Sequence, residues 1–179
     1  DFLVTGTMVQ EAQDMLDRHF KVIDAFIAKM KARTVDNIYF VACGSPLCAA
    51  QTAEILIKRY SNVPVYSFSG QEFLTLTPYG LGVNSVVIAI SDSGNTEEVV
   101  NSVKLAQDKG ALVLSLTKNA TGNRLAEISN HLLAYEGECI WVLHTMATFY
   151  LSLSYIKNKT TSKEPEKILK DLNKLPGAL

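Results

Sequence analysis

Three hydroxyl side chains occur within six residues of one predicted turn. Ser91, Ser93 and Thr96 belong to the segment SDSGNTEE, which follows a buried apolar run and opens a helix. Hydroxyl groups and backbone N–H groups at a helix N-terminus can surround a phosphate with neutral donors. Glu97 and Glu98 occupy the same positive helix end, so a bound phosphate requires that their carboxylates point away from it.

A structural interpretation of this turn is also open. Asn95 and Glu98 have the spacing of a capping box, in which each side chain bonds the backbone N–H of the other residue. Capping needs one hydroxyl at most, which leaves two of the three hydroxyls unexplained. The spacing alone therefore decides neither for capping nor for phosphate binding.

A second chemically suggestive turn is Cys43-Gly44-Ser45-Pro46, which follows an apolar run ending at Ala42. Gly44 allows a tight turn, Ser45 is placed to cap the next helix, and Pro46 suits the first helical position. Capping explains these residues by itself, and an anion at the same free N–H groups is the alternative. Ligands of open parallel sheets bind at the carboxyl ends of the strands, so both turns are candidate ligand loops.

Acid–base candidates are few. Glu138 and His144 lie near the end of the last predicted strand and are weak catalytic candidates, with capping or core packing as the alternative. His19 and His131 are interpreted as packing residues. The chain has no P-loop, GxGxxG or GxSxG motif and no CxxC pair, so we expect neither a cofactor nor a metal.

The elements that position these residues are predicted by the apolar pattern. Five short apolar runs predict buried strands, at residues 37–42, 64–68, 85–90, 112–116 and 131–135. Helical patterns separate them, at residues 47–60, 69–75, 96–109 and 122–128. This alternation predicts an α/β fold, a three-layer α-β-α sandwich with a five-stranded parallel sheet in the flavodoxin-like order 2-1-3-4-5.

Three further apolar surfaces need to be covered. Residues 9–31 predict one long helix with a heptad row, residues 139–156 predict a helix that is apolar on nearly every face, and a last helix carries a leucine-rich stripe. The row consists of Val9, Leu16, Ile23 and Met30, and the stripe of Ile168, Leu169, Leu172 and Leu175. Because soluble monomers rarely expose large apolar patches, we expect the chain to pair, as a homodimer or with a second domain of its kind.

Composition excludes several classes of protein. Of the 179 residues 47% are hydrophobic, the net charge is -1 and no long basic run occurs, which argues against nucleic acid or an anionic membrane as a partner. The three cysteines are an odd number and predict a reducing, cytoplasmic location. The chain begins without methionine and stops just after a helical pattern, so we expect both ends to be cut.

At these turns the sequence resembles the sugar isomerase (SIS) domain family. SDSGNTEE matches the phosphate-binding signature SxSGxTxE of that family, and Cys43-Gly44-Ser45 matches its other ligand loop. The resemblance covers about residues 35–157, so we expect an N-terminal helical extension at 1–34, an SIS domain at 35–157, and a linker and helix at 158–179 that lead towards a second domain. It implies a sugar-phosphate site lined by Cys43, Gly44, Ser45, Ser91, Asp92, Ser93 and Thr96.

A narrower resemblance is to the first half of the fructosamine-6-phosphate deglycases. The segments VACGSPLCAAQTA, SGQEF, ECIWVLH and LNKLPGAL carry it. It implies an enzyme that converts an open-chain ketoamine 6-phosphate to glucose 6-phosphate and an amine. Enzymes of this group carry a Glu…His catalytic stretch in a second SIS domain, and no segment of this sequence matches it; Pro46 also replaces a hydroxyl residue common in the wider family. The alternative is a non-catalytic sugar-phosphate sensor, as in regulators that join SIS to a DNA-binding module.

Overall fold

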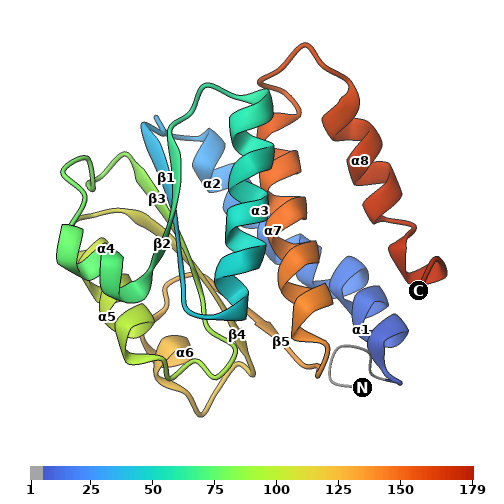
Figure 1. The fold of residues 1–179 in the computed structure, drawn as a ribbon, viewed down its shortest axis with the longest axis horizontal. Helices are drawn as coiled ribbons and strands as arrows, with labels where there is room; N and C mark the ends of the chain where they lie inside the picture. The colour runs from blue at the N-terminus through green and yellow to red at the C-terminus, as the bar shows by residue number, and fades with distance from the viewer. Residues whose placement is uncertain (1–5) are drawn as a thin grey trace.

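A five-stranded parallel sheet forms the centre of the molecule (Figure 1). The computed structural model describes residues 6–179, so the first five residues of the expected N-terminal extension lie outside it. The strands are β1 (Asn37–Ala42), β2 (Val65–Ser69), β3 (Ser85–Ile90), β4 (Leu112–Lys118) and β5 (Leu132–Tyr135). Their order, β2-β1-β3-β4-β5, confirms the predicted flavodoxin-like arrangement.

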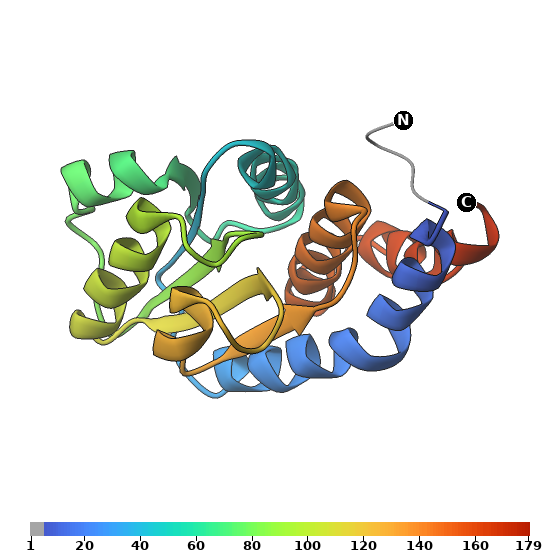
Figure 2. The same ribbon diagram turned by 90° about the horizontal axis from the view of Figure 1, so that it is seen from below.

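Helices cover both faces of the sheet and make three layers (Figure 2). One face packs against α2 (Phe20–Lys31), α3 (Ser45–Tyr60) and α7 (Ile140–Ile156). The other face packs against α4 (Gly70–Leu76), α5 (Glu97–Asp108) and α6 (Arg124–Ile128). Successive residues of a strand point to opposite faces, which is why Phe40 joins the first core and Tyr39 and Val41 join the second.

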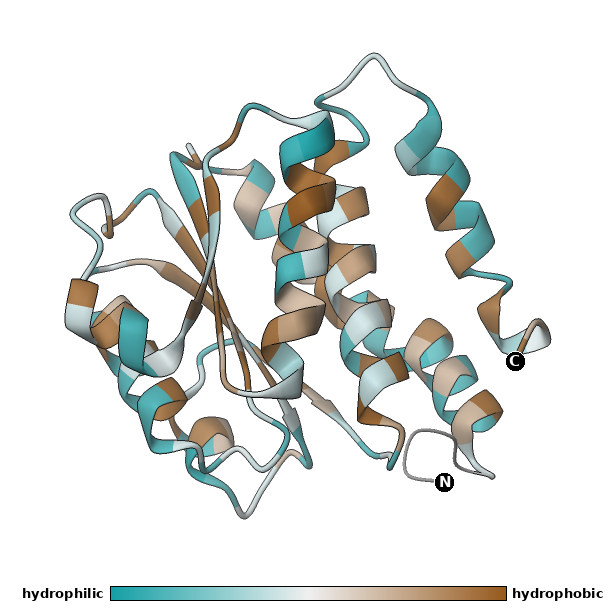
Figure 3. Ribbon diagram, viewed as in Figure 1, coloured by the Kyte–Doolittle hydropathy of each residue, from teal (hydrophilic) through white to brown (hydrophobic). Residues whose placement is uncertain are grey.

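The central strands are buried on both faces because they are mainly apolar. All six residues of β3 are buried, and the central strands are mostly brown, the hydrophobic colour, in Figure 3. A run without polar alternation is typical of a parallel strand between two helical layers. The strands therefore form a rigid support for the turns at their carboxyl ends.

The N-terminal helix differs from its prediction. It consists of α1 (Met8–Asp14), a π-helical turn η1 (Met15–His19) and α2, in place of one regular helix. A π turn adds a residue to the helix and rotates the face that follows it. Ile23 and Met30 of the heptad row are therefore in the core, whereas Val9 is 47% exposed and Ala12 and Met15 are buried in its place.

The chain itself covers most of the apolar surfaces that suggested a partner. Helix α7 packs against α3, α2 and α8 (Glu164–Leu172), and Leu169 and Leu172 of α8 are buried. A short 3-10 turn, η2 (Leu175–Gly177), follows and contacts α1. The reasoning from these three surfaces to a dimer is therefore wrong, and the oligomeric state stays a prediction. In the described part of the chain, no helix is both long and apolar enough to cross a membrane.

Glu11 of α1 ties the N-terminal helix to the loop that leads into α7. Its carboxylate accepts hydrogen bonds from the backbone N–H groups of Glu138 (3.0 Å) and Cys139 (2.8 Å), at the N-terminus of α7. Burial alone would raise the pKa of Glu11. Three hydrogen bonds, from Thr7 and from the two N–H groups, favour the charged carboxylate, as does the charge of Lys118. Together they outweigh burial, so the pKa of Glu11 is lowered. A carboxylate from a distant helix thus caps α7 where the sequence offers no local cap.

Candidate functional site

The two predicted ligand turns lie next to each other. Ala42 at the end of β1 is the register partner of Ile90 at the end of β3, so the turns that begin at Cys43 and Ser91 leave adjacent strands at the same edge. After β1 the chain moves outward to β2 and then returns to the other side of β1 as β3. Such a reversal of strand order is where open α/β sheets bind ligands. The turns lie at the lower edge of the sheet in Figure 1.

The first turn depends on Gly44. Its backbone has φ 66° and ψ -137°, a conformation open almost only to glycine. Helix α3 begins directly after it, at Ser45, two residues before the predicted start, and Pro46 lies in its first turn. Ser45 is therefore a helical residue and does not cap α3. Among the described residues its hydroxyl has no hydrogen-bond partner, which leaves it available beside the positive end of a 16-residue helix.

The second turn brings two of its three hydroxyls together. Ser91 Oγ lies 2.9 Å from Thr96 Oγ1, and Ser91 is only 3% exposed. The hydroxyl of Ser93 accepts a hydrogen bond from the backbone N–H of Asn95. In the described part of the chain, the backbone N–H groups of Ser93 and Thr96 have no acceptor. The turn thus offers hydroxyl and N–H donors that a phosphate could use.

The capping interpretation of Asn95 and Glu98 is wrong. Thr96 is the residue at the start of α5, and no side chain caps that helix. The Asn95 side chain instead accepts from the backbone N–H of Arg124, 3.1 Å away. The capping box of this chain is at Ser69 and Glu72, at the start of α4.

The two glutamates after the turn have different surroundings. The backbone of Gly70 lies so close to Glu98 that a Cβ there would be 2.7 Å from the Glu98 Cβ, which places the Cβ of Glu98 against the start of α4. Glu97 is exposed. That both carboxylates point away from a bound phosphate stays a prediction.

Gly94 lets the loop before α6 press against the second turn. Gly94 has φ 63°, and a Cβ at this position would lie 2.0 Å from Asn123 Oδ1 and 2.6 Å from Thr117 Oγ1. The carbonyl of Gly94 accepts from the backbone N–H of Leu125 at 2.8 Å. The glycine of the SDSGNTEE segment is therefore required by close packing as well as by its backbone angle.

The carboxylate of Asp92 is held by buried residues from two other elements. Asp92 Oδ1 accepts a 2.8 Å hydrogen bond from the hydroxyl of Tyr135, at the end of β5. The same hydroxyl lies 2.5 Å from Nε2 of His144, on α7. His144 is 2% exposed, and burial lowers its pKa to about 4 although the charge of Asp92 opposes this shift. His144 is therefore uncharged at neutral pH and enclosed by protein.

Glu138 pairs with a lysine at the end of β4. Its side chain is 72% exposed and its Oε1 is 2.9 Å from Lys118 Nζ, at the end of β4. The hydrogen bond with Glu138 is the main reason that the pKa of Lys118 is raised. Lys118 also interacts with Asp92 through its charge, so it places a cation at this edge of the sheet.

Tyr135 is the site-associated residue that sequence reasoning missed. The sequence analysis placed it only as the last residue of the predicted strand 131–135. Its position at the carboxyl end of that strand was the one feature that could have suggested a place near the ligand turns. The contact with Asp92 spans 43 residues of sequence and depends on the register that pairs Tyr135, at the end of β5, with Lys118, at the end of β4. Neither periodicity nor motif spacing carries that information.

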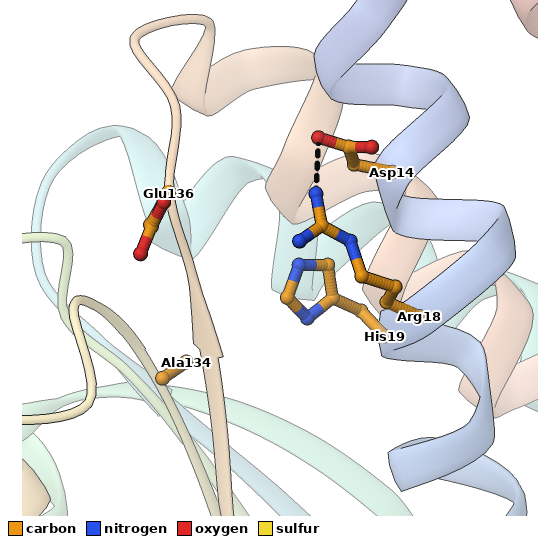
Figure 4. A pocket seen from close by; sticks show the side chains of 5 residues that line it. All are labelled: Asp14, Arg18, His19, Ala134 and Glu136. Carbon is orange, nitrogen blue, oxygen red and sulfur yellow. Dashed lines mark ion pairs between the residues drawn. The ribbon is translucent and has the colours of Figure 1, made fainter.

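A small hollow lies between the N-terminal helix and the end of β5, and no residue of the two turns lines it (Figure 4). Asp14, Arg18, His19, Ala134 and Glu136 line it, and its volume is about 80 Å³. Arg18 is already paired with Asp14 at 2.6 Å. Small-molecule sites usually have volumes of ~300 Å³ or more. The hollow is thus too small for a sugar phosphate, and His19 has the packing position expected of it.

Comparison with known proteins agrees with this arrangement. The chain is 41% identical over 179 residues to the fructoselysine 6-phosphate deglycase of Escherichia coli strain K12 and spans 52% of that protein. It is 31% identical over 166 residues to the isomerizing glutamine–fructose-6-phosphate aminotransferase of Clostridium acetobutylicum, covering 87% of this chain and 27% of that one. The chain therefore spans about half of the first relative and about a quarter of the second.

Solved structures show the same fold. The Vibrio vulnificus NanR protein, complexed with ManNAc-6P, matches 96% of this chain and 67% of its own with a TM-score of 0.69 at 17% identity. Residues 32–156, which include every strand and both candidate turns, match the SIS domain. The chain belongs to the SIS domain family.

Proposed function

We propose that the two turns bind the phosphate of a phosphorylated sugar or ketoamine. The observation that carries the proposal is the pair of hydroxyls, Ser91 Oγ and Thr96 Oγ1, 2.9 Å apart at the strand-order reversal between β1 and β3. The Ser45 hydroxyl and the free N–H groups of Ser93 and Thr96 add donors from the same edge. These donors are neutral, so they select a phosphate through directed hydrogen bonds.

We further propose that the whole protein is a fructosamine-6-phosphate deglycase or a related phosphosugar isomerase. The likeness to the Escherichia coli deglycase over the full chain supports this. The reaction would move a proton between neighbouring carbons of an open-chain ketoamine 6-phosphate and release glucose 6-phosphate and an amine. An anchored phosphate that does not react would position the carbon to be deprotonated. No disulfide joins the three cysteines in the described residues, which supports a cytoplasmic location.

In this proposal the acid–base residues come from outside the described chain. Glu138 is exposed and paired with Lys118, and His144 is buried behind Asp92. Glu138 is thus already engaged in an ion pair and His144 is enclosed by protein, so neither is an unengaged acid–base group at the turns. The same observation favours the alternative that this domain senses a sugar phosphate without converting it. Turnover by the full-length protein separates the two functions, because a sensor binds and does not convert.

Calorimetry tests the binding proposal directly. We expect fructose 6-phosphate to bind and fructose to bind far more weakly, because the Ser45 hydroxyl and the N–H groups of Ser93 and Thr96 have no other partner among the described residues. Equal affinities for the two sugars would show that the turns hold no phosphate.

We also propose that this domain pairs with a second SIS domain, in the same protein or in another copy. Support comes from exposed apolar side chains on the α4–β3 loop and the adjacent edge strand, namely Leu76, Tyr79, Val83 and Tyr66. Tyr39 links the two parts, because its ring stacks on Tyr66 and its hydroxyl lies beside Gly80. Light scattering at micromolar concentration tests pairing of the isolated chain: a mass of 19.7 kDa at every concentration would exclude it.

A further inference from the structure

A buried chain of polar groups runs behind the candidate phosphate turn. It consists of the Asp92 carboxylate, the Tyr135 hydroxyl and the His144 imidazole, which belong to the β3–α5 turn, β5 and α7. Tyr135 and His144 are almost fully enclosed, with 1% and 2% of their surfaces exposed. Buried polar groups cost stability unless they are paired, and here the two buried side chains pair with each other and with the half-buried Asp92.

The direction of the hydrogen bonds follows from the donors available. A tyrosine hydroxyl carries one hydrogen, and an ionised carboxylate can only accept. Tyr135 therefore donates to Asp92 Oδ1. The Tyr135 oxygen then accepts from His144, so the imidazole carries its hydrogen on Nε2. His144 thus donates to Tyr135, and Tyr135 donates to Asp92. We call this series of two hydrogen bonds the relay.

The backbone of Asp92 is fixed from the neighbouring strand as well. Its carbonyl oxygen accepts from the backbone N–H of Lys118 at 3.1 Å and from Thr117 Oγ1 at 3.3 Å. With the side chain bonded to Tyr135, Asp92 has little freedom to rotate. The residues on either side of it, Ser91 and Ser93, belong to the candidate phosphate site, so their placement depends on how Asp92 is held.

We propose that Tyr135 and His144 are positioning residues of the phosphate site, which hold the Asp92 carboxylate against β5 and α7. This inference rests on the proposed phosphate binding and extends it. A free carboxylate in this turn could swing towards a bound phosphate and repel it. Bonded to Tyr135, the carboxylate stays on the core side, and the hydroxyl and N–H donors of the turn face the ligand.

The test uses two tyrosine substitutions of the same kind. Tyr135→Phe removes the relay hydroxyl and keeps the ring in the core. Tyr155→Phe is the matched control, because Tyr155 is also 1% exposed and its hydroxyl is buried without a hydrogen-bond partner in the described structure. We expect Tyr135→Phe to weaken fructose 6-phosphate binding about ten- to a hundredfold, as for loss of a buried hydrogen bond to a charged group. Tyr155→Phe should bind as the unchanged chain does.

A second substitution separates positioning from general damage to the fold. If Tyr135 acts through Asp92, then Tyr135→Phe should change the affinity less than about twofold in an Asp92→Asn background, since the two effects are then not additive. Nitrogen-15 NMR of the three imidazoles gives a readout that needs no ligand. We expect His144 to carry its hydrogen on Nε2 at neutral pH and to lose that signature in Tyr135→Phe.

The possible failures are distinguishable. If the unchanged chain does not bind fructose 6-phosphate, the proposed function is wrong, whatever the imidazole spectrum shows. If it binds and Tyr135→Phe binds equally well, the positioning role is overturned while phosphate binding stands. A fully additive effect of Tyr135→Phe in the Asp92→Asn background would also overturn it, because Tyr135 would then act on the fold and not through Asp92.

Discussion

The hydroxyls of Ser91 and Thr96 face each other 2.9 Å apart, although the two residues lie at opposite ends of the turn between β3 and α5. The hydrogen bond closes the turn. One hydroxyl donates its hydrogen to the other, and the accepting hydroxyl keeps a rotatable hydrogen that a ligand can accept. This pair is therefore the part of the site where a small substitution should have the clearest effect.

We expect Thr96→Val to weaken fructose 6-phosphate binding by about 1–3 kcal/mol, because it leaves a buried phosphate oxygen without its donor. Valine keeps the branched shape, so packing changes little. Thr52→Val is the control, because the hydroxyl of Thr52 bonds only the carbonyl of Cys48 on the exposed side of α3. Calorimetry measures both. A change within ~0.3 kcal/mol for Thr96→Val would mean that Thr96 only begins the helix.

Gly94→Ala should destabilise the fold and abolish binding. The new Cβ would lie 2.0 Å from Asn123 Oδ1, which itself bonds the backbone N–H of Ala126 and cannot retreat freely. Gly122→Ala is a matched control, since Gly122 also has a positive φ but open space around its Cβ position. We expect the control to lose about 1 kcal/mol from backbone strain and Gly94→Ala to lose clearly more.

Urea denaturation of the two alanine variants checks this difference. Equal losses would show that Asn123 moves aside and that the close contact at Gly94 is unimportant. Binding of fructose 6-phosphate to any folded Gly94→Ala protein then reports whether the turn itself is distorted.

Glu11→Gln should lower the free energy of unfolding at pH 7 by about 1–3 kcal/mol, because it weakens the charged cap of α7. The pKa of Glu11 is lowered by folding, so its contribution is present above the unfolded value of 4.5 and is lost as the pH falls through the folded pKa. The difference between the variant and the unchanged chain should therefore shrink below pH 4.5. Denaturation at a series of pH values measures it.

Glu127→Gln is the control for this prediction. Glu127 is exposed on α6, and the same change of charge there should leave stability nearly unaffected. A loss for Glu127→Gln as large as that for Glu11→Gln would attribute the effect to net charge and not to the cap.

The isolated chain should have negligible deglycase activity. Its two acid–base candidates are both engaged, with Glu138 in an exposed ion pair and His144 enclosed by the core. Turnover of fructoselysine 6-phosphate, followed by release of glucose 6-phosphate, measures this. A rate near that of a complete enzyme would contradict the prediction, and Glu138→Gln and His144→Gln would then show which residue is responsible.

The sequence by itself determined the sheet, its order and the turns that carry the candidate site. Strands such as Ser85–Ile90 are predictable because a continuous apolar run can be buried only between two helical layers. Gly44 and the SDSGNTEE turn are also visible locally, because tight turns at strand ends constrain the residue types within a few positions. The parallel order then places both turns at one edge.

Only the tertiary structure decided which side chains meet across the fold. The relay from Asp92 through Tyr135 to His144, and the cap that Glu11 provides 128 residues before Cys139, depend on strand register and helix placement. The π turn at Met15–His19 likewise places Val9 on the surface while Ile23 and Met30 of the same heptad row are buried. Packing of α8 on α7 buries Leu169 and Leu172 of the leucine-rich stripe, for which the sequence suggested a partner. Such contacts are selected by the whole packed core, so periodicity within one segment cannot reveal them.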